Sequence, residues 1–310
     1  MSRPRHFLTL EALGAEGIER VLARAVELSR LRGSADHPKP LAGKSVALVM
    51  EKASTRTRVS FEVGIVELGG HPLALAGRDL QIGRGEPIED TARVLSRYVH
   101  AIVHRTFAHA TLERLAAFAA VPVVNALSDS HHPCQLLADL AIVRREHGSL
   151  GGGLRVAWIG DGNNVARSLA IGCGKVGMRM AMGTPEGYRF EDEFLDDLRR
   201  IVPELDLAVA ADPAQAVRGA VAVYTDVWTS MGQEAESEQR RRDFAEYQVN
   251  AKLMSRAPKD AIFMHCLPAH RGEEVTDEVI DGPQSVVVRQ AGNRMHVQKG
   301  ILAWMLAAQA

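Results

Sequence analysis

Cysteine is scarce in this chain. Only three of the 310 residues are cysteines, namely Cys134, Cys173 and Cys266. They lie far apart, their number is odd, and none has the short spacing of a paired site, so neither a disulfide framework nor a zinc site is expected. Such usage is typical of a reducing compartment, and we expect a cytoplasmic location.

An excess of charge of one sign is also absent. The sequence has 37 Lys and Arg against 38 Asp and Glu, a formal net charge of −1. This balance gives no general attraction to nucleic acid or to an anionic membrane, so neither is expected as a partner. No apolar run is long enough to span a membrane, and residues 1–8 lack the apolar run of a secretory signal.

The remaining composition is that of a soluble globular protein. Hydrophobic residues make up 46% of the chain and charged residues 24%. At this length the chain can form one large domain or two of ordinary size, with sizeable cores.

Residues 45–70 have the most informative local pattern. The apolar run 46–50 has the length and flanks of a buried strand. Ser54 and Thr55 are residue types that begin helices, apolar residues follow at helical spacing, and Gly69-Gly70 ends the pattern. The sequence therefore predicts a strand that turns into a helix near Ser54.

The turn between this strand and this helix has the composition of an anion site. It reads Ser54-Thr55-Arg56-Thr57-Arg58, which adds hydroxyls and two guanidiniums to the positive end of a helix dipole. A capped helix whose arginines face water is the alternative, and for Ser-Thr alone it would be preferred. For the whole run we favour a site for phosphate.

Strands and helices alternate along both halves of the chain. The fold class expected is α/β, with two domains, each a parallel sheet flanked by helices, and the active site in the cleft between them. The glycine-rich segment 148–153 is the best boundary. We expect a first domain over 1–147, a second over 148–294, and a C-terminal helix, 295–310, that packs back on the first. The charged segment 233–254 is expected to be helical, with Arg240-Arg241-Arg242 on a solvated face.

Polar residues gather where the expected strands end, in both halves. Open α/β sheets bind ligands at this edge. Each cluster has an ordinary structural explanation, such as a helix cap for Asn163-Asn164 or a small buried side chain for Cys266, but together they favour a site. The Gly160-Asp161-Gly162 turn also suggests a dinucleotide fold. That fingerprint needs a third small residue, where this chain has Val165.

Four motifs, in order and correctly spaced, resemble the aspartate/ornithine transcarbamylase family, and the last two resemble its ornithine branch. They are Ser54-Thr55-Arg56-Thr57-Arg58, His132-Pro133-Cys134-Gln135, Asp226-Val227-Trp228-Thr229-Ser230-Met231-Gly232 and His265-Cys266-Leu267-Pro268. The resemblance covers nearly the whole chain. It implies carbamoyl transfer from carbamoyl phosphate to the side-chain amine of L-ornithine, giving L-citrulline and phosphate.

The resemblance also assigns the carbamoyl phosphate contacts. Ser54, Thr55, Arg56 and Thr57 would hold the phosphate together with Arg105. Thr57, Arg105 and His132 would donate to the carbonyl oxygen. The carbamoyl NH2 would donate to Gln135 and to the backbone near Cys266 and Leu267. Arg294 matches a further contact, and Gln81 matches a residue lent by a neighbouring subunit, which implies a homotrimer with a shared active site.

For ornithine, the resemblance assigns residues of the second half. Asn164 and the backbone at Met231 would bind the carboxylate, and Asp226 and Ser230 the α-ammonium. Asp226 beside Cys266 would lie near the reactive amine, with Cys266 orienting it or helping it lose its proton rather than forming a covalent intermediate. The resemblance makes Arg105, His132, Asp226 and Cys266 the catalytic residues. Neither a metal nor another cofactor is expected, and we expect ordered binding with domain closure.

The sequence departs from the family pattern in three places, of which Cys134 leaves little in doubt and the other two leave the amine open. Cys134 stands where Thr is common, and Ala269-His270-Arg271 and Gly292 also differ. The alternatives are a carbamoyltransferase for putrescine or an acylated ornithine, a nucleotide-dependent dehydrogenase, or a binding protein without catalytic activity. The Ser230-Met231-Gly232 loop argues against the first two amines, since putrescine lacks the carboxylate and acylation removes the α-ammonium.

Overall fold

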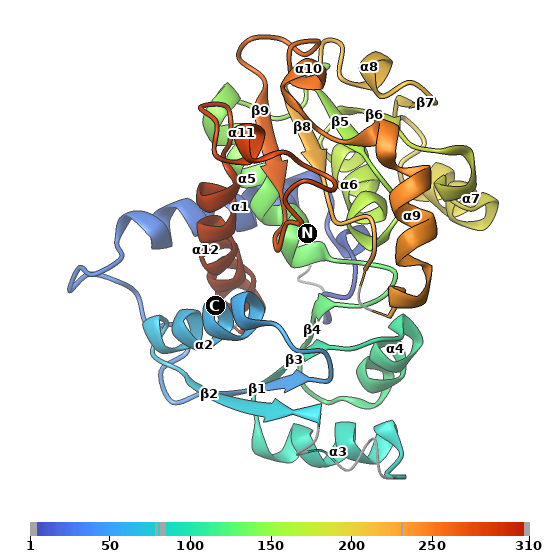
Figure 1. The fold of residues 1–310 in the computed structure, drawn as a ribbon. Helices are drawn as coiled ribbons and strands as arrows, with labels where there is room; N and C mark the ends of the chain where they lie inside the picture. Colours follow the sequence, from blue (N-terminus) through green and yellow to red (C-terminus); the bar gives the residue numbers. More distant parts are fainter. Residues whose placement is uncertain (1–4, 78–79, 81–84, 231, 307–310) are drawn as a thin grey trace. The chain divides into compact units, whose positions relative to one another are not determined.

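The chain divides into two compact units in a computed structural model that describes residues 5–77, 80, 85–230 and 232–306. The first unit comprises Met1–Ala138 with Gly292–Ala310, and the second comprises Asp139–Ala291 (Figure 1). The expected fold class is confirmed: each unit is a parallel sheet flanked by helices. The expected domain limits, 147/148 and 294/295, remain a prediction.

The first unit is built on a four-stranded parallel sheet with the order β2-β1-β3-β4. Its strands are β1 (Ser45–Met50), β2 (His71–Ala76), β3 (Ala101–Arg105) and β4 (Val123–Leu127). Its helices are η1 (Leu10–Ala12), α1 (Ala15–Arg30), α2 (Thr55–Glu67), α3 (Ile88–Tyr98) and α4 (His109–Phe118). Two helices cross the division between the units, α5 (Pro133–His147) and α12 (Val287–Leu306).

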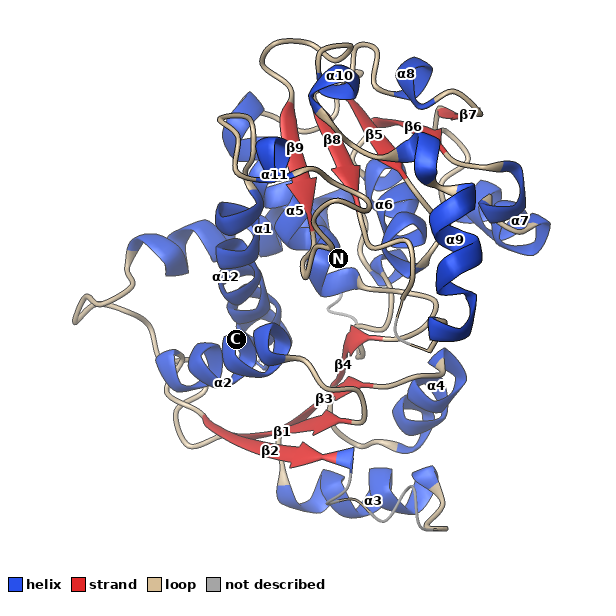
Figure 2. Cartoon of the chain, in the orientation of Figure 1, coloured by secondary structure: helices blue, strands red, loops and turns tan. Residues whose placement is uncertain are grey.

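Helices cover both faces of this sheet. Figure 2 shows α2 and α3 on opposite sides of it. Helices α3 and α4 share an apolar cluster with Ala47, Val49 and Ile102 of the strands. The end of α12 packs on α1 so closely that a Cβ at Gly300 would lie 2.9 Å from the Val21 carbonyl oxygen. This packing explains why that position is a glycine.

The second unit is built on a five-stranded parallel sheet with the order β7-β6-β5-β8-β9. Its strands are β5 (Arg155–Ile159), β6 (Arg179–Gly183), β7 (Leu207–Ala210), β8 (Ala222–Thr225) and β9 (Ile262–His265). Its α-helices are α6 (Asn164–Lys175), α7 (Asp192–Ile201), α8 (Pro213–Ala216), α9 (Ser237–Asp243), α10 (Ala251–Met254) and α11 (Asp277–Ile280). Its short 3-10 helices are η4 (Glu186–Tyr188), η5 (Glu234–Glu236) and η6 (Ala245–Tyr247).

Each sheet has a point where the strand order reverses. In the second unit the chain leaves β5 toward β6 on one side and returns to β8 on the other. In the first unit β1 lies between β2 and β3 in the same way. Such points open a crevice at the carboxyl ends of the strands, which is where the predicted site residues stand.

The expectation of one helix over 233–254 is wrong. The segment is broken into η5, α9, η6 and α10. The solvated face is also wrong for Arg240, which is buried. Its guanidinium donates to Asp161 Oδ2 at 2.6 Å and to the Trp228 carbonyl at 3.0 Å. These partners come from distant loops, so the local pattern of charges could not reveal them.

Among the helices in the described ranges, none has the length and the hydrophobicity needed to cross a bilayer.

Candidate functional site

The phosphate-site turn lies where β1 leads into α2, as predicted. Ser54 is the N-cap of α2, and its Oγ accepts from the Thr57 N–H at 3.3 Å. The Ser54 hydroxyl also donates to Thr57 Oγ1 at 3.0 Å. The hydroxyls are therefore fixed at the positive end of the helix dipole.

Two guanidiniums from distant elements converge on Thr57. Arg105, at the end of β3, has Nη1 at 3.5 Å from Thr57 Oγ1, and Arg294 of α12 donates from Nη2 at 2.8 Å. Arg105 is 8% exposed and Arg294 is 3% exposed. Two buried cations beside a helix N-terminus favour an anionic ligand, and the planar guanidinium suits a phosphate.

His132 and Gln135 lie at the start of α5, in the first unit, and both are buried. Burial, and then the charges of Arg294 and Arg105, hold the pKa of His132 well below its usual range. The imidazole is therefore neutral at neutral pH and can donate one hydrogen bond without adding charge.

The remaining predicted residues of this half differ in exposure. Arg56 is half-buried on α2. Arg58 is exposed and pairs with Glu62 at 3.0 Å, so this part of the arginine run faces water. Thr55 is exposed as well. Gln81 lies outside the described residues.

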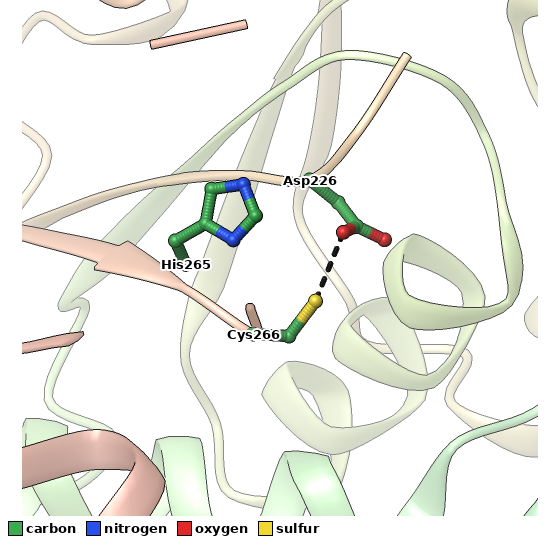
Figure 3. A group of neighbouring side chains, drawn as sticks. All are labelled: Asp226, His265 and Cys266. Carbon is green, nitrogen blue, oxygen red and sulfur yellow. Dashed lines mark hydrogen bonds between the residues drawn. The ribbon is translucent and has the colours of Figure 1, made fainter. Parts of the chain in front are cut away.

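In the second unit, hydrogen bonds within the predicted ornithine site converge on Asp226 (Figure 3). It follows β8, and its carboxylate accepts from three donors. Oδ1 accepts from the Cys266 thiol at 2.9 Å and from the Val227 N–H at 2.9 Å. Oδ2 accepts from Asn163 Nδ2 at 3.0 Å. Two predicted catalytic residues, 40 positions apart, are thus in direct contact.

The Cys266-Leu267 turn is held by the histidine that precedes it. His265 Nε2 lies 3.1 Å from Glu274 Oε1, and both side chains are fully buried. Its Nδ1 accepts from the Leu267 N–H at 2.9 Å. Leu267 has φ +58°, a left-handed conformation that is unfavourable for a non-glycine residue. The hydrogen bond from its own N–H helps to hold it there.

The other ornithine residues stand on adjoining loops. Asn164 begins α6, directly after the N-cap Asn163, whose Oδ1 accepts from the Val165 and Ala166 N–H groups. Ser230 is half-buried, and its N–H donates to Gln233 Oε1 at 3.0 Å. Met231 lies outside the described residues.

Asp226, His265 and Cys266 also have the atom types of a metal site, with ligand atoms within 4.8 Å of one another. Their donors and acceptors are already engaged within the protein. The Cys266 thiol donates to the Asp226 carboxylate, and both ring nitrogens of His265 have partners. The cluster is therefore arranged as a hydrogen-bond network rather than as a set of metal ligands.

Sequence reasoning missed several residues that hold this machinery. Asn163 was explained as a cap, and it is one, but it also binds Asp226. Glu274 holds His265, and Glu51 binds His104 beside Arg105. The only sequence signal for Glu51 is its place directly before the phosphate turn.

The comparisons with known proteins agree with this geometry. Residues 5–145 match the model of the aspartate/ornithine carbamoyltransferase carbamoyl-P binding domain, and residues 152–305 match that of the Asp/Orn binding domain. The chain is 52% identical to ornithine carbamoyltransferase from Anoxybacillus flavithermus over 304 residues, 97% of this chain and 96% of that protein. It is 50% identical to the Bacillus subtilis protein of that name, covering 97% of this chain and 94% of the other.

A solved structure is equally similar. Ornithine carbamoyltransferase from Pyrococcus furiosus superposes with a TM-score of 0.94 at 48% identity, covering 99% of this chain and 98% of that one. Both sequence and fold therefore match along nearly the whole length. The chain belongs to the aspartate/ornithine carbamoyltransferase family.

Proposed function

We propose that this protein transfers the carbamoyl group of carbamoyl phosphate to the side-chain amine of L-ornithine, giving L-citrulline and phosphate. The observation that carries the proposal is the meeting of two buried guanidiniums at Thr57, on the first turn of α2. This arrangement suits a donor whose leaving group is phosphate. The identity of the acceptor amine, ornithine, is inferred from the names of the relatives.

The first unit would bind and activate carbamoyl phosphate. Ser54, Thr55, Arg56 and Thr57 would hold the phosphate with Arg105 and Arg294. As the carbonyl carbon becomes tetrahedral, its oxygen gains negative charge, which Thr57, Arg105 and the neutral His132 would stabilise. Gln135 would accept from the carbamoyl NH2.

The second unit would bind ornithine. Asp226 and Ser230 would hold the α-ammonium, and Asn164 with the backbone at Met231 the carboxylate. The reactive amine has a pKa of about 10 in water and must lose a proton before it attacks. The Asp226–Cys266 pair supplies an acceptor beside it. The carbon–nitrogen bond then forms, the bond between the carbonyl carbon and the phosphate oxygen breaks, and the nitrogen gives its second proton to the departing phosphate, with no bond made to Cys266.

We propose that carbamoyl phosphate binds first and that the two domains then close on ornithine. In this order the backbone carbonyls near Cys266 and Leu267 would reach the carbamoyl NH2. Isothermal titration tests it: ornithine should bind measurably only in the presence of carbamoyl phosphate or a non-reactive analogue. Equal ornithine affinity with and without it would contradict the order.

We further propose a homotrimer in the cytoplasm, with Gln81 reaching the site of a neighbouring subunit. On the first unit, large apolar side chains are exposed at Val94 and Tyr98 of α3, at Phe107, and at Phe118 of α4. A second copy of the chain would cover them. Light scattering should give three times the chain mass of 33.7 kDa, and a monomer would contradict the assembly.

The activity itself is tested with 13C-labelled carbamoyl phosphate and ornithine, followed by NMR. The label should appear in the ureido carbon of citrulline, in equal amount to the phosphate released. Phosphate release without a ureido product would contradict the transfer.

A further inference from the structure

We propose that Glu51 is a positioning residue, which fixes the end of β3 so that the Arg105 guanidinium points into the phosphate turn. The proposal rests on the function proposed above and adds a residue that the four motifs do not contain. Glu51 is the residue after β1 and stands three positions before the cap Ser54.

Glu51 bonds to the residues on both sides of Arg105. Its Oε1 lies 2.7 Å from His104 Nε2, and its Oε2 accepts from the Thr106 hydroxyl at 2.9 Å. Its backbone N–H donates to the Arg105 carbonyl at 3.0 Å. His104 and Thr106 are fully buried. A single residue therefore holds three consecutive residues of the chain.

Arg105 needs such an anchor because the sheet is irregular at this point. The register with β4 shifts between His104 and Arg105: His104 faces Asn125, whereas Arg105 faces Leu127. The extra residue of this bulge is Ala126 of β4, and it interrupts the β3–β4 ladder beside Arg105. Glu51 reinforces the other edge of β3, along which β3 pairs with β1.

The side chains on either side of Arg105 point away from its guanidinium. His104 and Thr106 both contact the Glu51 carboxylate, whereas the Arg105 between them has its Nη1 beside Thr57 Oγ1, as expected where successive side chains alternate in direction. Glu51 therefore holds the strand from the side opposite to the guanidinium, which lies against Thr57. Burial raises the pKa of Glu51, but the bonds from His104 and Thr106 outweigh it and keep the carboxyl below its usual pKa.

The substitution Glu51→Gln distinguishes a positioning role from simple electrostatics, because the two predict opposite changes in phosphate affinity. Removing a negative charge near an anion site strengthens anion binding by Coulomb's law alone. Positioning predicts the opposite, because an amide cannot accept from both His104 and Thr106. We expect inorganic phosphate, measured by titration calorimetry, to bind about tenfold more weakly, since small misplacements of a catalytic group are costly.

A second pair of variants covers the case in which Glu51→Gln does not fold. Thr106→Val has nearly the same shape as threonine but no hydroxyl, and Thr106→Ser keeps the hydroxyl. The first should weaken phosphate binding, and the second should stay within about twofold of the wild type. The exposed Glu27→Gln, whose partner is Arg24, is the matched control and should change neither phosphate binding nor turnover.

Steady-state kinetics then tests whether the positioning by Glu51 affects the reaction. In Glu51→Gln the KM for carbamoyl phosphate should rise by the same factor as the phosphate affinity falls, with the KM for ornithine unchanged. Unchanged or tighter phosphate binding in Glu51→Gln, equal effects of the two Thr106 variants, or a wild type that binds no phosphate would overturn the proposal. Phosphate binding without citrulline formation would instead reject the proposed function, and the binding results would still decide the role of Glu51.

Discussion

Asp226→Asn is the substitution that tests the second unit most sharply. The carboxylate has donors on both sides, with the Cys266 thiol and the Val227 N–H on Oδ1 and Asn163 Nδ2 on Oδ2. An asparagine has only one accepting oxygen. In either orientation its NH2 group faces a donor that has lost its acceptor.

Asn163 cannot relieve this mismatch by turning its amide. Its Oδ1 already caps α6 by accepting from the Val165 and Ala166 N–H groups, and a flip would remove that cap at a cost of about 1 kcal/mol. One unmet buried donor costs about 1–3 kcal/mol. We therefore expect the free energy of unfolding to fall by about 1–3 kcal/mol, with the fold retained.

The effect on ornithine should be larger than the effect on stability. Asp226 is proposed to bind the α-ammonium, and a hydrogen bond to a charged group contributes about 1.5–3 kcal/mol. The KM for ornithine should rise about 10- to 100-fold, measured by citrulline colorimetry at saturating carbamoyl phosphate. The KM for carbamoyl phosphate should stay within about twofold, because its proposed contacts are mostly in the first unit.

The matched control is Asp212→Asn. Asp212 caps α8 through an oxygen that asparagine also has, so this variant should behave as the wild type. An Asp226→Asn enzyme with the wild-type KM for ornithine would refute the reasoning. A fall in activity that follows only the loss of folded protein would do the same.

The remaining predictions concern both units. Cys266→Ser should fold and lower kcat by about 100-fold, and mass spectrometry of the wild type with carbamoyl phosphate should find no carbamoyl adduct on Cys266. The pKa of His132 is held well below its usual value, so kcat/KM for carbamoyl phosphate should show no titration of this group between pH 8 and about 6.5. A midpoint near 6.5 that disappears in His132→Asn would contradict the neutral imidazole. Lys299 is fully buried and its Nζ lies 2.6 Å from Glu67 Oε2. Glu67→Gln leaves this buried ammonium without its charged partner, so the free energy of unfolding, measured in urea, should fall by about 2–3 kcal/mol. Lys299→Met should cost less, since Glu67 keeps Arg32 as a partner; equal losses would contradict this account.

The parts of the fold that sequence predicted well are those set by neighbouring residues. The strand before Ser54, the cap at Ser54 and the helix after it depend on residues within one short segment, and they were confirmed. The alternation of strands and helices was sufficient to predict parallel sheets. It also predicted that polar residues would gather at the carboxyl ends of the strands.

The contacts that build the site were harder to predict because they join distant residues. Arg294 reaches Thr57 across 237 positions, and Asp226 meets Asn163 across 63. The family resemblance assigned Arg294 and Asp226 to the site, but not these contacts. Glu51 and Glu274 were missed for the same reason, since a single glutamate has no pattern until its buried histidine partner is known. The prediction of a solvated face was wrong for Arg240, because its guanidinium binds residues of other loops.

The choice of amine tests the central claim most directly. The purified protein should be given carbamoyl phosphate and, in turn, ornithine, acetylornithine, putrescine, lysine and aspartate, with ureido product measured by colorimetry. We expect a strong preference for ornithine, because Asp226 and Ser230 need a free α-ammonium and Asn164 needs a carboxylate. Turnover of another amine would contradict the assignment of the second unit, and no turnover with any of them would contradict the proposed function.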